Sequence, residues 1–228
     1  RKIQMNKKIN IVTAITIALA FLILFNMSSF AYNCNEIRTD TIRLHIIASS
    51  DSEKDQKIKY TVRDEILKKY PSMFTVKTTR NEAEIILKEE LSTIESFVND
   101  ILIRNNITYS AEAELKEEYF ETRKYDNGIK LPAGKYMSLI INLGNAQGKN
   151  WWCVIFPSLC LPAAQNTEKI IESVYTADEK YILESSDKYE IRFRLIEYIE
   201  LLKNKVAREN PINKEILMQS LIIIFLLL

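Results

Sequence analysis

The chain has 228 residues, of which 47% are hydrophobic, and its 31 lysines and arginines nearly balance its 30 aspartates and glutamates. This length allows one domain with a core of its own. The balanced charge gives none of the basic stretches that nucleic-acid-binding proteins use, so no nucleic-acid partner is expected. With four glycines and neither a GxGxxG nor a P-loop motif, the chain also lacks the common phosphate-binding sequences.

The N-terminal segment has the pattern of an export signal. Residues 1–8 carry four positive charges and no negative one, and an apolar run from Ile9 to Phe25 follows them. Small residues then stand at Ser29 and Ala31, the spacing that a signal peptidase recognises. A basic start, an apolar centre and a small-residue site together predict a secretory signal peptide.

We therefore predict a signal peptide over residues 1–31, cleaved between Ala31 and Tyr32. The alternative is an uncleaved anchor in which residues 9–25 contact the membrane, because about 20 apolar residues span a bilayer. Residues 32–40 are expected to be a flexible start of the mature chain. The folded domain is expected over residues 41–210.

Periodicity along residues 41–210 predicts alternating helices and strands. Thr41–Ser49 alternates as a strand, in which Arg43 and His45 form the wetter face. Helices are predicted from the capping residues near Ser50 to Tyr70 and over Arg80–Arg104, where apolar residues recur every three or four positions. The remaining predicted elements are a half-exposed strand after Asn106, a hairpin over Tyr136–Phe156, and helices near Thr167–Tyr175 and Ile191–Arg208.

This order predicts an α+β fold, a single compact domain in which an antiparallel sheet has its helices packed on one side. The last 18 residues, 211–228, end in an apolar run that is too short to span a membrane alone. The sequence assigns no role to this tail.

Catalytic and metal-binding patterns are absent from the sequence. His45 is the only histidine, and it has no nucleophile partner at a recognisable spacing. The three cysteines form no CxxC pair, so neither a zinc site nor a redox motif is predicted. We expect no metal, no cofactor and no enzyme activity.

The stretch GKNWWCVIFPSLCLP contains both tryptophans of the chain. In a strand, Trp151 and Trp152 point to opposite faces, and Phe156 lies on the side of Trp152. Core packing explains one such face. The other is either a second core or an exposed aromatic surface, which would suit a binding partner.

Two cysteines of this stretch, Cys153 and Cys160, lie seven positions apart with Pro157 between them. A turn near Pro157 could bring them to bridging distance, and export would permit their oxidation. The two open alternatives are a disulfide bond and two reduced buried thiols. Cys34 remains as the odd thiol.

Three stretches of the chain closely resemble the stage II sporulation protein R family. They are IRLHIIASSDSEKDQKIKYTVRDEIL, LPAGKYMSLIINLG and GKNWWCVIFPSLCL, and the resemblance runs from about Ile42 to Phe193. One departure is Ser49, where the family pattern has asparagine.

The resemblance implies a signalling protein of endospore-forming bacteria that is exported from the forespore into the space between the septal membranes. There it would activate a membrane-embedded aspartic protease of the mother cell and so trigger processing of the sigma-E precursor. The residues expected to contact this partner are Trp151, Trp152, Phe156, Arg43, His45 and Tyr136. The alternative is an exported hydrolase that acts on cell-wall material, with His45 or Asp51 as the acid or base.

Overall fold

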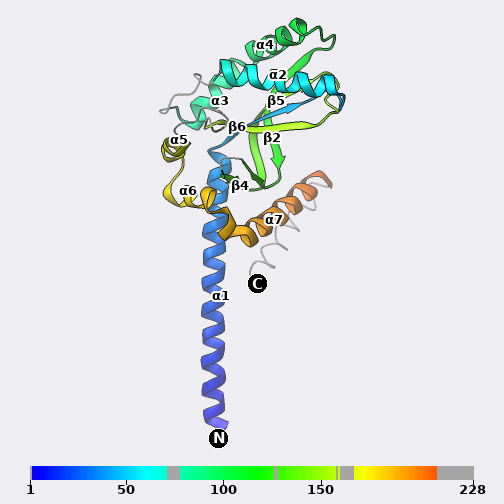
Figure 1. The fold of residues 1–228 in the computed structure, drawn as a ribbon. Coiled ribbons are helices and arrows are strands. Elements are labelled where there is room, and N and C mark those ends of the chain that lie inside the picture. Colours follow the sequence, from blue (N-terminus) through cyan, green and yellow to red (C-terminus); the bar gives the residue numbers. More distant parts are fainter. Residues whose placement is uncertain (1, 71–77, 126–127, 158, 160–166, 210–228) are drawn as a thin grey trace.

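The computed structural model describes residues 2–70, 78–125, 128–157, 159 and 167–209. A compact body of strands and helices stands at one end of a long helix, α1 (Lys2–Thr39), which projects away from it (Figure 1). Both helices and strands contribute to the body, so the predicted α+β class with an N-terminal apolar helix is confirmed. Residues 126–127, 160–166 and the apolar tail 211–228 lie outside the described residues.

A four-stranded sheet forms the centre of the body, in the order β2-β5-β1-β6. Its strands are β1 (Ile42–Ile47), β2 (Ala111–Phe120), β5 (Gly134–Leu143) and β6 (Asn150–Phe156). The pairs β2–β5 and β1–β6 are antiparallel, but β1 and β5 run parallel. The sheet is therefore mixed, whereas the sequence pattern predicted only antiparallel pairs.

The predicted hairpin over residues 136–156 is wrong, because β1 lies between its two strands. All of β1 from Ile42 to Ile46 is buried, on both faces. A strand buried on both faces belongs in the middle of a sheet, where it pairs on both sides. A short ribbon of β3 (Arg123–Lys124) and β4 (Lys130–Leu131) lies beside the main sheet.

Three helices are associated with one face of the sheet, namely α2 (Glu53–Lys69), α3 (Arg80–Glu89) and α4 (Leu91–Arg104). The sequence predicted a single helix over 80–104, but the chain forms two helices that meet at Glu90. The apolar stripes are as predicted, since Ile58, Val62 and Ile66 on α2 and Val98 on α4 are buried against the sheet. This apolar layer is the main core.

A second core joins the remaining helices to the other side of the sheet, so the helices do not lie on one side only. It contains Val154 of β6, Leu131 of β4 and residues of α1, α5 (Thr167–Val174), α6 (Ala177–Glu184) and α7 (Glu190–Glu209). A turn of 3₁₀-helix, Ser186–Tyr189, precedes α7. In Figure 1 these helices lie on the side of the sheet from which α1 projects.

The end of α1 belongs to this second core. Cys34 and Ile37 are completely buried, and residues 32–39 continue the helix that begins in the apolar segment. The expected flexible start over residues 32–40 is therefore wrong, because these residues supply an apolar face that the second core covers. The predicted cleavage site, the peptide bond between Ala31 and Tyr32, lies within helix α1.

Candidate functional site

The face of β1 that carries Arg43 and His45 differs from the apolar face on the main core. Successive strand residues point to opposite faces, so these two side chains alternate with Ile42, Leu44 and Ile46. The sequence predicted a wetter face here, but Arg43 is 0% exposed and His45 is 4% exposed. A cation and an imidazole are therefore held inside the domain.

The Arg43 guanidinium is enclosed by aromatic rings. Its Cζ atom lies 4.0 Å from the ring centre of Phe120 and 5.0 Å from that of Tyr136. Its Nη2 donates a hydrogen bond of 2.7 Å to the hydroxyl of Tyr125. The Nε and Nη1 atoms have no hydrogen-bond partner among the described residues. Cation–π contacts offset part of the cost of burying this charge, but two donors remain unsatisfied.

His45 links the strand to a carboxylate and an indole ring. Its Nδ1 lies 2.6 Å from Oε2 of Glu118, and its ring centre lies 5.5 Å from that of Trp152. The Nε2 atom is buried and has no partner within the described chain. The Arg123 guanidinium also lies over the Trp152 ring, with Cζ 4.2 Å from the ring centre.

These residues line an open pocket of about 570 Å³. Its wall comes from β1, from the end of β2 and the segment after it, and from the start of β6. Three cations, Arg43, Arg123 and Lys124, line the pocket against two carboxylates, Glu118 and Glu121. Because His45 contacts Glu118, cationic character dominates the rest of the wall.

The two tyrosines beside Arg43 remain neutral. Burial raises the pKa of Tyr136 and of Tyr125, although the Arg43 charge opposes the rise at both. Their hydroxyls are therefore protonated at neutral pH. The Tyr125 oxygen can accept from Arg43, whereas the Tyr136 hydroxyl donates to the carbonyl of Pro132.

The structure separates the six expected contact residues into two groups. Arg43, His45, Tyr136 and Trp152 come together around the pocket, with Tyr136 buried behind Arg43. Phe156 is buried in the main core, and Trp151 packs against the same core. Both therefore lie on the sheet face opposite the pocket. The strand alternation would have placed Phe156 beside Trp152, but the pairing of β6 with β1 shifts between Ile42 and Arg43. That irregularity turns Phe156 to the other face.

Sequence reasoning did not find four residues of the site, namely Glu118, Phe120, Arg123 and Tyr125. The stretch YFETRKY has the composition of an exposed strand end followed by a loop. Its one detectable signal is the density of aromatic residues next to cations, which suits cation–π contacts.

Two of the three cysteines, Cys34 and Cys153, lie in the described part of the chain. Cys34 is a free buried thiol in the second core, and Cys153 of β6 is disulfide-bonded. Cys160, the partner expected for Cys153, lies outside the described residues. Among the residues that the structure describes, no group of three or more histidines, cysteines or carboxylates could hold a metal ion.

The fold and the pocket define a class of protein: an α+β domain behind an N-terminal apolar helix, with a buried arginine and an exposed aromatic pocket on one sheet face. The family model described as stage II sporulation protein R matches residues 38–166. The chain belongs to this family, and its role is in sporulation.

A stage II sporulation protein R of Bacillus subtilis (strain 168) is 31% identical over 183 residues, which cover 72% of this chain and 81% of the relative. No solved structure gives a significant match. The helix over Thr13–Thr39 is long and apolar enough to cross a membrane and, being near the N-terminus, is compatible with an export signal.

Proposed function

We propose that this protein is an exported signal that activates a membrane-embedded aspartic protease across the sporulation septum, which then processes the sigma-E precursor. It acts in the space between the septal membranes, and it acts by binding rather than by catalysis. The observation that carries the proposal is the pocket lined by Arg43. A buried cation with unsatisfied donors lowers stability, so a fold selected for stability alone would not keep it.

The pocket suits an acidic segment of the partner. Arg123 and Trp152 form a stacked pair at its wall, and arginine and tryptophan are enriched among residues that dominate binding energy. An acidic side chain placed here meets the Arg123 guanidinium, while Glu118 is engaged with His45. To shift a receptor from about 1% to 99% active, binding must favour the active state by roughly 5.5 kcal/mol.

The opposite sheet face supplies a matched control for this site. There the Arg63 guanidinium lies over the ring of Trp151, 5.5 Å from its centre, as Arg123 lies over Trp152. The two arginine–tryptophan pairs thus have similar chemistry, but only one lines the pocket. Alanine at Arg123 and alanine at Arg63 remove equivalent groups from the two faces.

The test uses the whole chain, produced with the protease and the sigma-E precursor in a bacterium that does not sporulate. We expect Arg123→Ala to reduce precursor processing at least tenfold and Arg63→Ala to leave it unchanged. Blots of the exported fraction check that both variants accumulate. Processing that survives Arg123→Ala and Trp152→Ala alike would refute the placement of the site.

The second candidate is the cell-wall hydrolase, because the His45–Glu118 pair lines a pocket as a general base would. Asp51 does not line that pocket; its Oδ1 accepts the backbone N–H of Lys149. Turnover of peptidoglycan fragments by the purified protein, abolished in His45→Gln, would favour this candidate. We expect no turnover.

A further inference from the structure

Strand β2 stands at one side of the sheet, where its only neighbour in the described sheet is β5. The two strands pair in unbroken register, from Ala111 opposite Leu143 to Phe120 opposite Gly134. Along an antiparallel edge strand, the N–H and C=O groups of every second residue bond to the neighbouring strand, and those of the residues between point outward. The outward groups of β2 therefore belong to residues of one parity.

Side chains of α4 bond to the outward groups at the start of β2. Asn99 donates from Nδ2 to the C=O of Ala111 at 3.0 Å, and its Oδ1 accepts the N–H of the same residue at 2.8 Å. Glu95 accepts the N–H of Ala113 through Oε2 at 2.9 Å. These contacts show that the odd-numbered residues of β2 direct their backbone groups outward.

The second half of the same edge is open. Its outward groups belong to Leu115, Glu117 and Tyr119, and the described part of the chain provides no hydrogen-bond partner for them. Exposed strand edges favour pairing with another chain, so proteins usually cover or interrupt them. An edge that is covered over its first half alone offers a site for strand addition, in which an extended segment pairs with the open backbone groups.

The open half of the edge leads into the pocket around Arg43. Glu118, Tyr119 and Phe120, at the end of β2, line that pocket together with Arg123. A segment paired along residues 115–119 therefore has one end at the pocket. The edge and the pocket form one continuous surface, which a single extended segment can contact.

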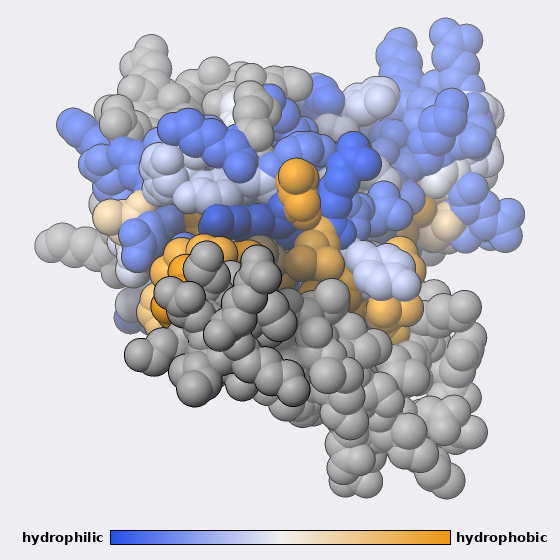
Figure 2. Space-filling model, turned by 90° about the horizontal axis from the view of Figure 1, so that it is seen from below, coloured by the Kyte–Doolittle hydropathy of each residue, from blue (hydrophilic) through white to orange (hydrophobic). Residues whose placement is uncertain are grey.

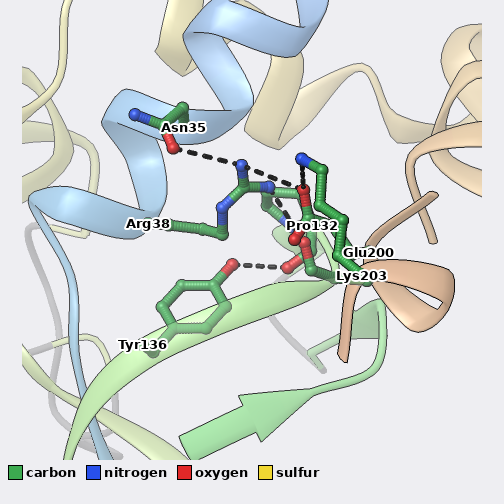
Figure 3. A network of polar contacts seen from close by, with 7 residues as sticks. Asn35, Arg38, Pro132, Tyr136, Glu200 and Lys203 are labelled. Atoms are coloured by element: carbon green, nitrogen blue, oxygen red, sulfur yellow. Dashed lines mark hydrogen bonds and ion pairs between the residues drawn. The ribbon is translucent and has the colours of Figure 1, made fainter. Parts of the chain in front are cut away.

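Glu117 is the charge that such a segment meets on the other face of the sheet. It is exposed and lines a second pocket, of about 320 Å³. The cations of the second pocket are Arg38, Arg80, Lys135 and Lys203. Within the described residues none of them forms an ion pair with Glu117; Lys203 and Arg38 instead contact Glu200, at 2.8 and 3.8 Å (Figure 3). The Glu117 carboxylate is thus available to a partner.

A basic side chain opposite Glu117 would complete an ion pair. Directly opposed residues of neighbouring strands attract when their charges differ and repel when they are alike. The second pocket leaves room for a long side chain, and hydrophilic residues surround the apolar centre of the end from which α1 projects (Figure 2). A second copy of β2 is a poor occupant, because this strand carries four glutamates and one lysine.

We propose that the open edge of β2, residues 115–119, receives an added strand from the partner. The occupant is an extended segment with an acidic residue beside Arg123 and a basic residue opposite Glu117. Backbone hydrogen bonds to the outward groups hold the segment, and the two charges select its sequence. This inference rests on the proposed function, because it describes how the partner of the same pocket binds.

The first test compares two substitutions at one position, in the full chain produced with the protease and the sigma-E precursor. Glu117→Pro removes an N–H that points away from β5, a place where edge strands tolerate proline, and the ring blocks an added strand. Glu117→Ala removes the side chain but keeps the N–H. We expect at least a tenfold loss of processing for proline and at most a threefold loss for alanine.

Full processing by an exported Glu117→Pro variant would overturn strand addition. The result is distinguishable from a failure of the proposed function: processing that is lost in Arg123→Ala and kept in Glu117→Pro refutes the added strand alone. Loss in Glu117→Pro with full processing in both Arg123→Ala and Trp152→Ala refutes the placement of the site in the pocket but supports the edge.

Amide hydrogen exchange of the unmodified chain decides the question even if the proline variant does not fold. With the purified protease in nanodiscs, exchange at Leu115, Glu117 and Tyr119 should slow at least tenfold, because their N–H groups become bonded. Exchange at Ala113, which Glu95 already covers, should change little. Unchanged exchange at the three open positions in the presence of bound protease would overturn the proposal.

The predicted charge of the segment is tested by reversal at two glutamates of β2. Glu117→Lys should reduce processing several-fold more than Glu117→Ala, because it opposes a basic residue. Glu112→Lys is the matched control, since Glu112 is also exposed but lies in the covered half of the strand. Equal processing by Glu117→Lys and Glu117→Ala would overturn the basic residue.

Discussion

The two faces of strand β1 differ in chemistry although both are buried. Ile42, Leu44 and Ile46 pack in the main core with hydrophobic residues of the sheet and of its covering helices. On the other face, Arg43 and His45 are buried among aromatic rings, and three of their nitrogen atoms have no hydrogen-bond partner in the part of the chain that the structure describes. The first face has the composition that stability requires, whereas the second is costly to keep.

This difference indicates where the protein interacts with its surroundings. A fold under pressure only for stability would replace Arg43 with an apolar residue, since such replacements of buried charges are often neutral or stabilising. Arg43 lines the pocket, and Arg123 and Trp152 form a stacked pair in the wall of the same pocket. We therefore assign the Arg43 charge to recognition of a partner. The comparison therefore predicts opposite consequences for substitutions on the two faces.

The largest effect on stability is expected on the apolar face. Leu44→Ala should lower the free energy of unfolding by about 2–5 kcal/mol, because it opens a cavity in a filled core. Its matched variant is Ser138→Ala, at a buried position opposite Arg43 whose hydroxyl has no partner among the described residues. That variant should change stability by less than about 1 kcal/mol. Urea denaturation measures both, and equal losses would contradict the comparison.

Trp151 and Trp152 are adjacent in the chain and lie on opposite faces of the sheet, so substitutions at these two positions compare the faces directly. Trp151→Ala should cost about 1–3 kcal/mol through lost contacts with the main core. Trp152→Ala should cost about 1 kcal/mol, since its contacts are chiefly His45 and Arg123. Thermal denaturation ranks the two. A larger loss for Trp152 would show that its face is the main stabilising one.

The smallest effect on stability is expected at Asp55, near the start of α2. Burial would raise the pKa of Asp55, but hydrogen bonds from Ser50, Tyr109 and Ser52 outweigh it and lower the pKa below its ordinary 3.8. A lowered pKa stabilises the fold above 3.8, and this contribution is lost as the pH falls through the folded pKa.

Asp55→Asn should therefore be less stable than the unmodified chain at pH 7, by about 1 kcal/mol or less. The difference should shrink as the pH falls below 3.8. Unfolding midpoints in urea at pH 7 and pH 3 measure it, and a gap that widens in acid would contradict the assignment.

The sequence predicted local structure well where one physical pattern dominated. The apolar period of α2 and α4 and the alternation of β1 were sufficient to place these elements, because each has a face that must be buried. Strand order was not predictable in this way. The turn residues between Gly144 and Lys149 suggested a hairpin, but β1, buried on both faces, takes the position between β5 and β6.

The site was predictable only in part, for a related reason. Arg43 and His45 were recognisable because they interrupt an apolar strand, and Trp152 because both tryptophans of the chain lie in one short stretch. Phe120 and Tyr125 were not, since their place beside Arg43 follows from the pairing of β2 with β5 and from the short β3–β4 ribbon, which the residue pattern did not predict. Phe156 was assigned to the wrong face because a shift in strand pairing between Ile42 and Arg43 leaves no trace in the residue pattern.

The central claim is that the face around Arg43 is kept for recognition rather than for stability. Charge reversal is unsuitable as a test, because Arg43 is completely buried and an acidic replacement would damage the fold. Arg43→Met keeps the approximate volume and removes the unsatisfied donors. The decisive measurement is precursor processing by this variant together with its melting temperature. We predict at least a tenfold loss of processing with an unchanged or higher melting temperature, whereas full processing, or a loss matched by an unstable fold, would contradict the account.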